Sequence, residues 1–147
     1  MIIQIILAFF GSIFPAILFN IDRKKLVWAG ISGSLGWTIY LIVFSYGESP
    51  IMASFLGAFV VGMYSEVMAR KLKAPSMQFS IPGIFPLVPG IIAYNTIIYI
   101  VDQNYPLAYP SAMKTVIIGG AIAFGIMLSS TTFRFVMKVH REIQLRK

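Results

Sequence analysis

The stretch SIPGIFPLVPGIIAYN, residues 80–95, decides the fold class of this chain. It places three prolines (Pro82, Pro86 and Pro89) and two glycines (Gly83 and Gly90) inside an otherwise apolar run. Proline removes a backbone donor and clashes with the preceding helical turn, and glycine gives the chain conformations that other residues rarely adopt. In a membrane, broken backbone persists only where protein or a water-filled cavity satisfies the freed polar groups. The stretch therefore predicts an interrupted membrane helix, which is either part of a binding site or a structural kink.

Composition extends this prediction to the whole chain. Its 147 residues are 58% hydrophobic and only 12% charged, whereas a soluble domain is about 25% charged. We predict an all-α polytopic membrane protein with one membrane domain, residues 1–147, located in the cell (plasma or inner) membrane. A spanning helix needs about 20 apolar residues. Five segments meet this length, at residues 2–21, 26–46, 51–69, 79–101 and 115–137. The fourth is either one kinked helix or a re-entrant piece followed by a helix that begins near Pro89.

The basic residues predict the orientation of these spans. They gather in the first predicted loop, the third loop and the tail: Arg23, Lys24, Lys25, Arg70, Lys71, Lys73, Arg134, Lys138, Arg141, Arg146 and Lys147. The second loop holds only Glu48, and the fourth holds Asp102 and Lys114. Because Lys and Arg favour cytoplasmic loops, the N-terminus is predicted outside and the C-terminus inside. Basic clusters between apolar runs fit this rule, so the net charge of +7 does not indicate a nucleic-acid partner.

The sequence lacks the residues and motifs that several kinds of catalytic and metal-binding site require. There is no cysteine, and the single histidine, His140, lies in the basic tail, where we expect it to be solvated. No cluster of His, Asp and Glu has metal-ligand spacing, and no nucleophile–base pair or phosphate-binding loop is present. We therefore expect no metal, no cofactor and no enzymatic activity.

The polar residues at membrane depth are the candidate site residues. Glu66 either forms an i, i+4 ion pair with Arg70 at the inner interface or serves as a proton or substrate relay facing a cavity. Residues 129–132, which include Ser129 and Thr132, either bond back to their own helix or form the polar wall of a pathway. Tyr94 and Asn95 follow the break by about one turn and either join helices or contact a ligand.

Small residues predict where the helices touch, because they let membrane helices approach closely. They recur every third or fourth position in the second and third segments, as Gly30, Gly33, Gly36, Ser54, Ala58 and Gly62, and Gly119, Gly120 and Gly125 mark the fifth segment. Trp37, in the middle of the second segment, is expected to pack between helices.

Two stretches carry a family resemblance. The sequence ARKLKAPSMQFSIPGIFPLVPGIIAY joins a basic loop to a PLVPG element and a tyrosine, and FNIDRKKLVWAGISGSLGWTIY contains the first loop and second segment. Together they resemble the small, C-terminal membrane half of the threonine/serine exporter family. The separate small subunit of that family is also similar to one component of a two-component succinate exporter.

The resemblance implies a function and a partner. It implies the small subunit of a two-component secondary exporter, with a separately encoded larger membrane subunit. The substrate is then a small carboxylate-bearing metabolite, either a threonine- or serine-like amino acid or a succinate-like dicarboxylate. The candidate pathway residues are Pro86, Pro89, Gly90, Tyr94, Asn95, Glu66, Ser129 and Thr132. The alternative is a scaffold subunit that stabilises a transporting partner without itself forming the path. Homo-oligomerisation is also open.

The predicted orientation can be tested by cysteine labelling, because the chain has no cysteine of its own. Cysteines at Ser49 and Ala108 should react with an impermeant thiol reagent added outside the cell. Cysteines at Ala74 and Gln144 should react only after the cells are permeabilised. Outside labelling of either inner position would contradict the orientation.

Overall fold

The described chain is entirely helical. The computed structural model describes residues 1–47 and 49–145, and side chains as far as Val139. The elements in order are α1 Ile2–Leu18, α2 Arg23–Ser45, α3 Pro50–Lys71, α4 Met77–Ile84, the short 3₁₀-helix η1 Phe85–Leu87, α5 Gly90–Val101 and α6 Tyr105–Leu145. This confirms the all-α prediction. The predictions for Glu48, for the side chain of His140 and for the basic side chains that follow it fall outside the described part.

Three or four of the described segments are able to span a membrane. By length and hydropathy, α2, α3 and α6 each qualify, and the bent pair of α4–η1 with α5 gives a fourth candidate. α1 is a shorter apolar helix of 17 residues. The structure therefore gives three or four candidate spans where the sequence predicted five. The first predicted span, residues 2–21, is missing from this count because α1 ends at Leu18.

Three of the helices are followed, two residues after their last residue, by a residue with left-handed backbone conformation. Asn20, Lys73 and Gln103 have φ of 54°, 48° and 55°, and follow α1, α3 and α5 respectively. In each case the next amide reaches back to a carbonyl five residues earlier, as in Ile21 N to Ala16 O at 3.0 Å. This closing turn satisfies helix-end carbonyls with backbone groups, which explains why α1 ends short of the predicted boundary.

The last helix is longer than the predicted span 115–137. α6 has 41 residues, and only Asp102, Gln103 and Asn104 separate it from α5. Pro106 does not prevent this, because a proline in the first helical turn lacks only an amide that would have no partner. Ala108 is consequently a buried helical residue, 5% exposed. Asn104, which is exposed, is the better outer position for cysteine labelling.

Small residues bring the helices together, as their spacing predicted. Ser12 of α1 packs on Gly33 of α2, and Ser129 of α6 packs on Gly62 of α3. A Cβ atom on Gly125 would lie 2.6 Å from the carbonyl oxygen of Phe55, closer than real Cβ atoms come to any neighbour. These positions therefore require small side chains for reasons of space.

Two of the predicted contact glycines do not touch another helix. A Cβ atom on Gly119 or Gly120 would meet nothing within 4 Å, and the same holds for Gly90 at the start of α5. The prediction that Gly119 and Gly120 mark a helix contact is wrong within this chain. The reason is the face of α6 on which they lie, because Ile118 and Ile122 at the same height are buried against α3 while Gly119 and Gly120 are exposed.

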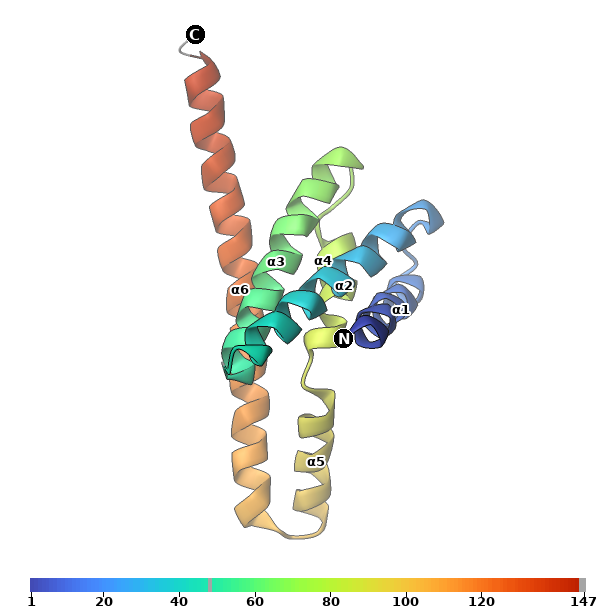
Figure 1. Cartoon of the computed structure of the whole chain (residues 1–147), viewed down its shortest axis with the longest axis vertical. Coiled ribbons are helices and arrows are strands. Elements are labelled where there is room, and N and C mark those ends of the chain that lie inside the picture. Colours follow the sequence, from blue (N-terminus) through green and yellow to red (C-terminus); the bar gives the residue numbers. More distant parts are fainter. Residues whose placement is uncertain (48, 146–147) are drawn as a thin grey trace.

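α3 and α6 run in the same direction, and three contacts between them show which residues lie at the same height. Phe55 stacks on Phe124, Gly62 packs on Ser129, and Arg70 lies over the ring of Phe133. The start of α3 is therefore near the level of Ile118, and both Pro50 and Ile118 line one cavity. Residues 105–118 extend beyond this level by about 20 Å, at 1.5 Å per residue. Only α5 accompanies them, and α5 has no buried residue. We call α5 and residues 105–118 the arm (Figure 1).

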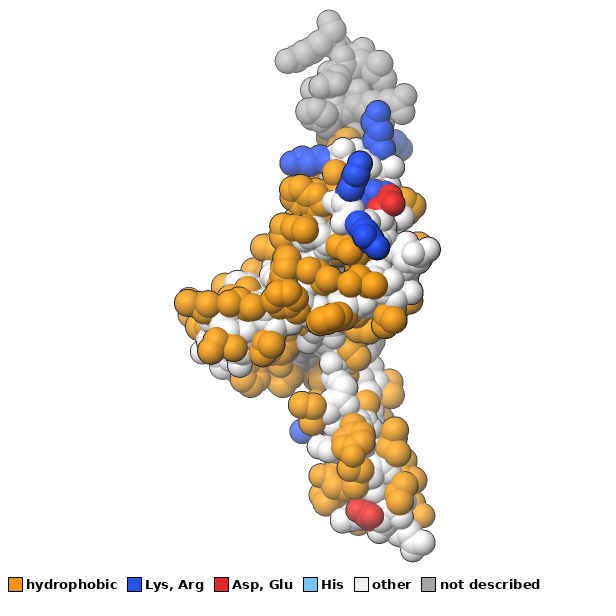
Figure 2. Space-filling view, turned by 90° about the vertical axis from the view of Figure 1, so that its right-hand side faces the viewer, with side chains coloured by type: hydrophobic (Ala, Val, Ile, Leu, Met, Phe, Trp, Pro, Cys, Tyr) orange, Lys and Arg blue, Asp and Glu red, His pale blue; other side chains and the backbone are white. Residues whose placement is uncertain are grey.

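Charge is distributed unevenly along the long axis. Figure 2 shows Lys and Arg side chains gathered toward the end at which α6 ends, with an acidic side chain near the opposite tip. The start of α2 and the end of α3 supply basic residues at the first end, and Asp102 lies in the turn at the tip. This separation agrees with the alternation of basic loops in the sequence.

We predict that Gly125→Ala destabilises the chain whereas Gly120→Ala does not. The first substitution forces α6 away from the backbone of α3, and overpacking of this kind costs about 1–3 kcal/mol. The second adds a methyl group in open space on the same helix, where alanine is the better helix former by up to about 1 kcal/mol. Thermal unfolding of the two variants in one detergent checks this, and equal midpoints would contradict the described α3–α6 contact.

Candidate functional site

The predicted break is present between α4 and α5. α4 passes into the 3₁₀-helix η1, and the axes before and after the break differ by 57°. Pro86 lies in η1, and Pro89 occupies the N-cap position of α5. The segment is thus a short helix followed by a second helix that begins at Gly90, next to the predicted start near Pro89.

Pro89, rather than Gly90, makes the turn. Pro89 has φ −77° and ψ 59°, and the amide of Gly90 donates to the carbonyl of Val88 at 2.8 Å. This is an inverse γ-turn, which proline favours because its φ is fixed near this value. Gly90 does not adopt a positive φ. The expectation that Gly90 takes a conformation reserved for glycine is therefore wrong.

The break leaves backbone polar groups without partners. No described backbone amide donates to the carbonyl of Pro86 or Leu87, and the amides of Ile91 and Ile92 have no recorded acceptor. The last two belong to the first turn of α5, where helix amides are normally free. The site therefore offers carbonyl oxygens and a helix N-terminus, which carries partial positive charge.

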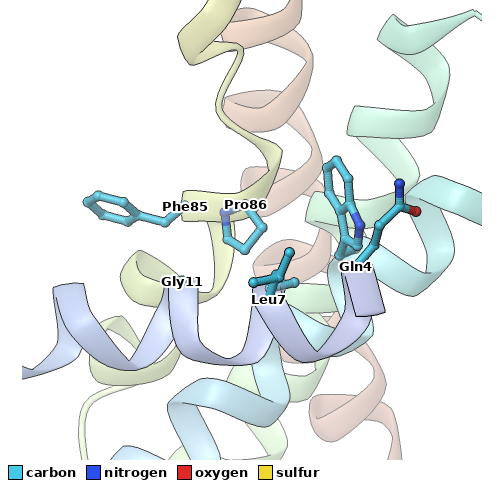
Figure 3. Close-up of a pocket in the computed structure, with 7 residues that line it drawn as sticks. Gln4, Leu7, Gly11, Phe85 and Pro86 are labelled. Carbon is cyan, nitrogen blue, oxygen red and sulfur yellow. The ribbon is translucent and has the colours of Figure 1, made fainter. Parts of the chain in front are cut away.

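Three cavities surround the break. The central cavity, about 340 Å³, lies between α2, the start of α3 and the break, and its wall includes Trp37, Tyr40, Ser54, Pro86, Pro89 and Gly90. The α1-side cavity, about 280 Å³, is lined by Gln4, Leu7, Ala8, Gly11, Trp37, Phe85 and Pro86. Figure 3 shows Pro86 and Phe85 facing the α1 residues Leu7 and Gly11 across this cavity. The α6-side cavity, about 460 Å³, is lined by Ile84, Val88, Pro89, Gly119, Ile122, Ala123 and Ile126.

The cavity walls are apolar with few polar groups. Of the described residues that line the three cavities, none is charged. The polar side chains are Gln4, Trp37, Tyr40 and Ser54. These walls offer no ionic partner, and an unpaired full charge is costly in a low-dielectric site, so the backbone groups at the break would have to pair with any charged group of a ligand.

Glu66 does not form the predicted ion pair. The one ion pair among the described residues joins Lys25 to Asp22 at 3.1 Å. Glu66 instead accepts a hydrogen bond from Ser130 at 3.4 Å across the α3–α6 contact. Arg70 lies over the ring of Phe133, 4.9 Å from its centroid. Glu66 is half-buried and lines none of the three cavities, so its prediction as a relay stays open.

Two of the four side chains in the hydroxyl run bond back to their own helix. Ser129 is fully buried and donates to the carbonyl of Ile126 at 2.7 Å, and Thr131 donates to Met127 at 2.9 Å. Thr132 is half-buried with no side-chain hydrogen bond recorded. None of them lines the three cavities. The structure supports back-bonding for Ser129 and Thr131.

The structure brings together only part of the predicted site. Pro86, Pro89 and Gly90 share the central cavity. Tyr94, which is 64% exposed, and Asn95 lie further along α5, on the arm, and line none of these cavities.

Sequence reasoning missed the contribution of Trp37 and of α1. Trp37 is assigned to packing by its position in the middle of α2, yet it borders two cavities at the break. The available signal was its indole, a polar donor on an otherwise small and apolar helix face. No pattern in the sequence indicated that residues of α1 would lie beside Pro86.

Comparisons with known proteins identify a family. The family described as "Threonine/Serine exporter, ThrE" matches residues 4–132. An uncharacterized protein of Haemophilus influenzae is 26% identical over 126 residues, which are 80% of this chain and 42% of that relative. The chain thus spans less than half the length of this relative. No solved structure matches.

Proposed function

The chain belongs to the threonine/serine exporter family, and we propose that it is the small membrane subunit of a two-component secondary exporter in the cell membrane. In this proposal the orientation follows the basic residues, with the C-terminus inside, and α1 crosses the membrane as a short helix that puts the N-terminus outside. The observation that carries the proposal is the uncharged set of cavities around the break. Ligand sites of secondary transporters commonly lie at interrupted helices near the middle of the membrane.

The chemistry of the break suits a small carboxylate-bearing metabolite. The free first-turn amides of α5 attract an anionic group, and the free carbonyls of Pro86 and Leu87 are acceptors for an ammonium group. A threonine- or serine-like zwitterion carries both groups. A succinate-like dicarboxylate would need a second cationic partner, and the cavity walls described here contain none. The site therefore favours the amino acid.

The arm supports the need for a larger partner. α6 is about 60 Å long at 1.5 Å per residue, and the hydrocarbon core of a bilayer is about 30 Å thick. α3 alone, with 22 residues, already has the length of one crossing. α5 and residues 105–118 continue past the part of α6 that α3 covers, and the described part of this chain packs no other helix closely beside them.

The surface of the arm is unsuited to water. Ile91 is 79% exposed, Ile97 is 61% exposed and Val101 is 74% exposed. α5 has 12 residues, none of them fully buried, and a helix of this length is marginal without tertiary packing. We therefore propose that the larger, separately encoded membrane subunit covers the arm.

A photo-crosslinking residue at Ile97 should capture this partner module when the two are expressed together. The same residue at Ile3, which is also largely exposed but lies on α1, should give little product and serves as the matched control. Mass spectrometry of the purified adducts identifies the captured chain. A product containing two copies of this chain would instead make the arm a homo-oligomer contact, and equal capture from both positions would leave the arm without a specific partner role.

Cells that express this chain together with the larger module should export L-threonine or L-serine, and cells with either chain alone should not. The reason is that the uncovered arm and the open cavities need the second module to complete a path. Time-resolved measurement of the amino acids released from preloaded cells checks this. Export by this chain alone in liposomes would sink the two-component proposal.

The double substitution Pro86→Ala/Pro89→Ala supplies the control within the complex. Alanines should restore a continuous helix, since a proline inside a helix costs about 3 kcal/mol. We expect normal expression and partner pull-down with export strongly reduced. Normal export by the assembled variant would favour the scaffold function, in which the break plays no part in transport.

A further inference from the structure

Trp37 lies at the point where two cavities meet. It is the α2 residue that lines both the central and the α1-side cavity, and Pro86 lines both from the other side. The indole and the Pro86 ring therefore both belong to the wall that separates the central cavity from the α1-side cavity, which we call the partition. On its other side Trp37 stacks on Tyr40, with ring centroids 4.8 Å apart and an interplanar angle of 9°.

The indole nitrogen of Trp37 is a donor without an acceptor. Its Nε1 atom is buried, and no described atom accepts a hydrogen bond from it. A buried donor that loses its water without gaining a partner costs about 1–3 kcal/mol, and such groups in folded proteins call for a specific explanation. Packing alone does not require a donor, because a purely hydrocarbon aromatic ring can also stack on Tyr40. The position thus carries a polar group that the described fold does not use.

We propose that Trp37 is a substrate-contacting residue, whose indole N–H donates to a carboxylate or hydroxyl oxygen of the transported metabolite at the break. The inference rests on the proposed export function. Because Nε1 is closed off in this conformation, contact requires the ring to turn toward one of the two cavities that it borders. The indole is only a donor, so it recognises an oxygen and not an ammonium group. The same turn of the ring opens the partition between the cavities, which couples recognition to passage.

The substitution Trp37→Phe isolates the donor. Phenylalanine keeps an aromatic ring to stack on Tyr40 and to fill the partition, and it removes only the N–H and part of the ring area. In the assembled complex we expect the KM for L-threonine export to rise about tenfold, as for the loss of a hydrogen bond to a charged group, with the maximal rate changed much less. Trp28→Phe is the matched control, because Trp28 is on the same helix and lines none of the cavities. Its KM should stay at the wild-type value.

A second measurement covers a Trp37→Phe variant that does not assemble. Trp28 and Trp37 are the two tryptophans of this chain, so the complex carrying Trp28→Phe can be prepared with 5-fluorotryptophan. The Trp37 signal is the ¹⁹F resonance that shifts in a matched sample in which Tyr40, its stacking neighbour, is replaced by Phe. L-threonine should move this resonance saturably, and L-threoninol, which lacks the carboxylate, should move it less.

The outcomes separate this inference from the proposed function. If the wild-type complex exports L-threonine but Trp37→Phe leaves KM unchanged, Trp37 is not a substrate contact and the export function stands. A Trp37 resonance that does not respond to L-threonine in an exporting complex has the same meaning. If the wild-type complex exports neither L-threonine nor L-serine, the proposed function fails first.

Discussion

The close contact between Gly36 of α2 and Gly57 of α3 is the constraint on which the rest of the structure depends. A Cβ atom on Gly57 would lie 2.8 Å from the carbonyl oxygen of Gly36, so the two backbones touch where a side chain would separate them. Leu87, in the middle of the break, packs against both glycines and is 3% exposed. Without hydrophobic association to drive them together in lipid, helices rely on such close fits. Leu87 therefore anchors the break, because its side chain packs where Gly36 and Gly57 bring α2 and α3 together.

Polar backbone groups set the second constraint. Pro86 and Pro89 remove two donors within four residues, and the γ-turn at Pro89 accounts for the amide of Gly90 alone. Lipid cannot satisfy the groups that remain, so protein, water or a bound molecule must lie against the break. The cavities on its two sides give room for this. In the proposed function, the uncharged walls and the free helix N-terminus are the reasons for preferring a small zwitterion to a doubly charged anion.

Part of the surface that this chain leaves uncovered lies on one side of the break. Gly90 and Gly119 have open space where a side chain would be, and Gly119 lines the α6-side cavity. The arm continues this uncovered region beyond the start of α3 (Figure 1). A second membrane module placed there would close the cavities and shield the arm at the same time. In this arrangement the break would lie between the two modules, as is common for sites formed by paired repeats.

The sequence by itself determined the helical class, the position of the break and most of the small-residue contacts. Each of these follows from local chemistry, because hydropathy, proline geometry and residue volume do not depend on distant parts of the chain. Helix ends were less predictable: α1 stops early because Asn20 adopts a left-handed turn, and α6 starts early because Pro106 is tolerated in its first turn.

Only the tertiary structure decided which residues share the site. It placed Trp37 beside Pro86, moved Tyr94 and Asn95 onto the arm, and gave Glu66 a serine partner on another helix in place of Arg70. These outcomes depend on the register of α3 against α6 and on the 57° bend at the break. The periodicity of a helix sequence determines which residues share a face. It does not determine the axial register of the helix against a neighbouring helix, or the direction that the chain takes after a kink.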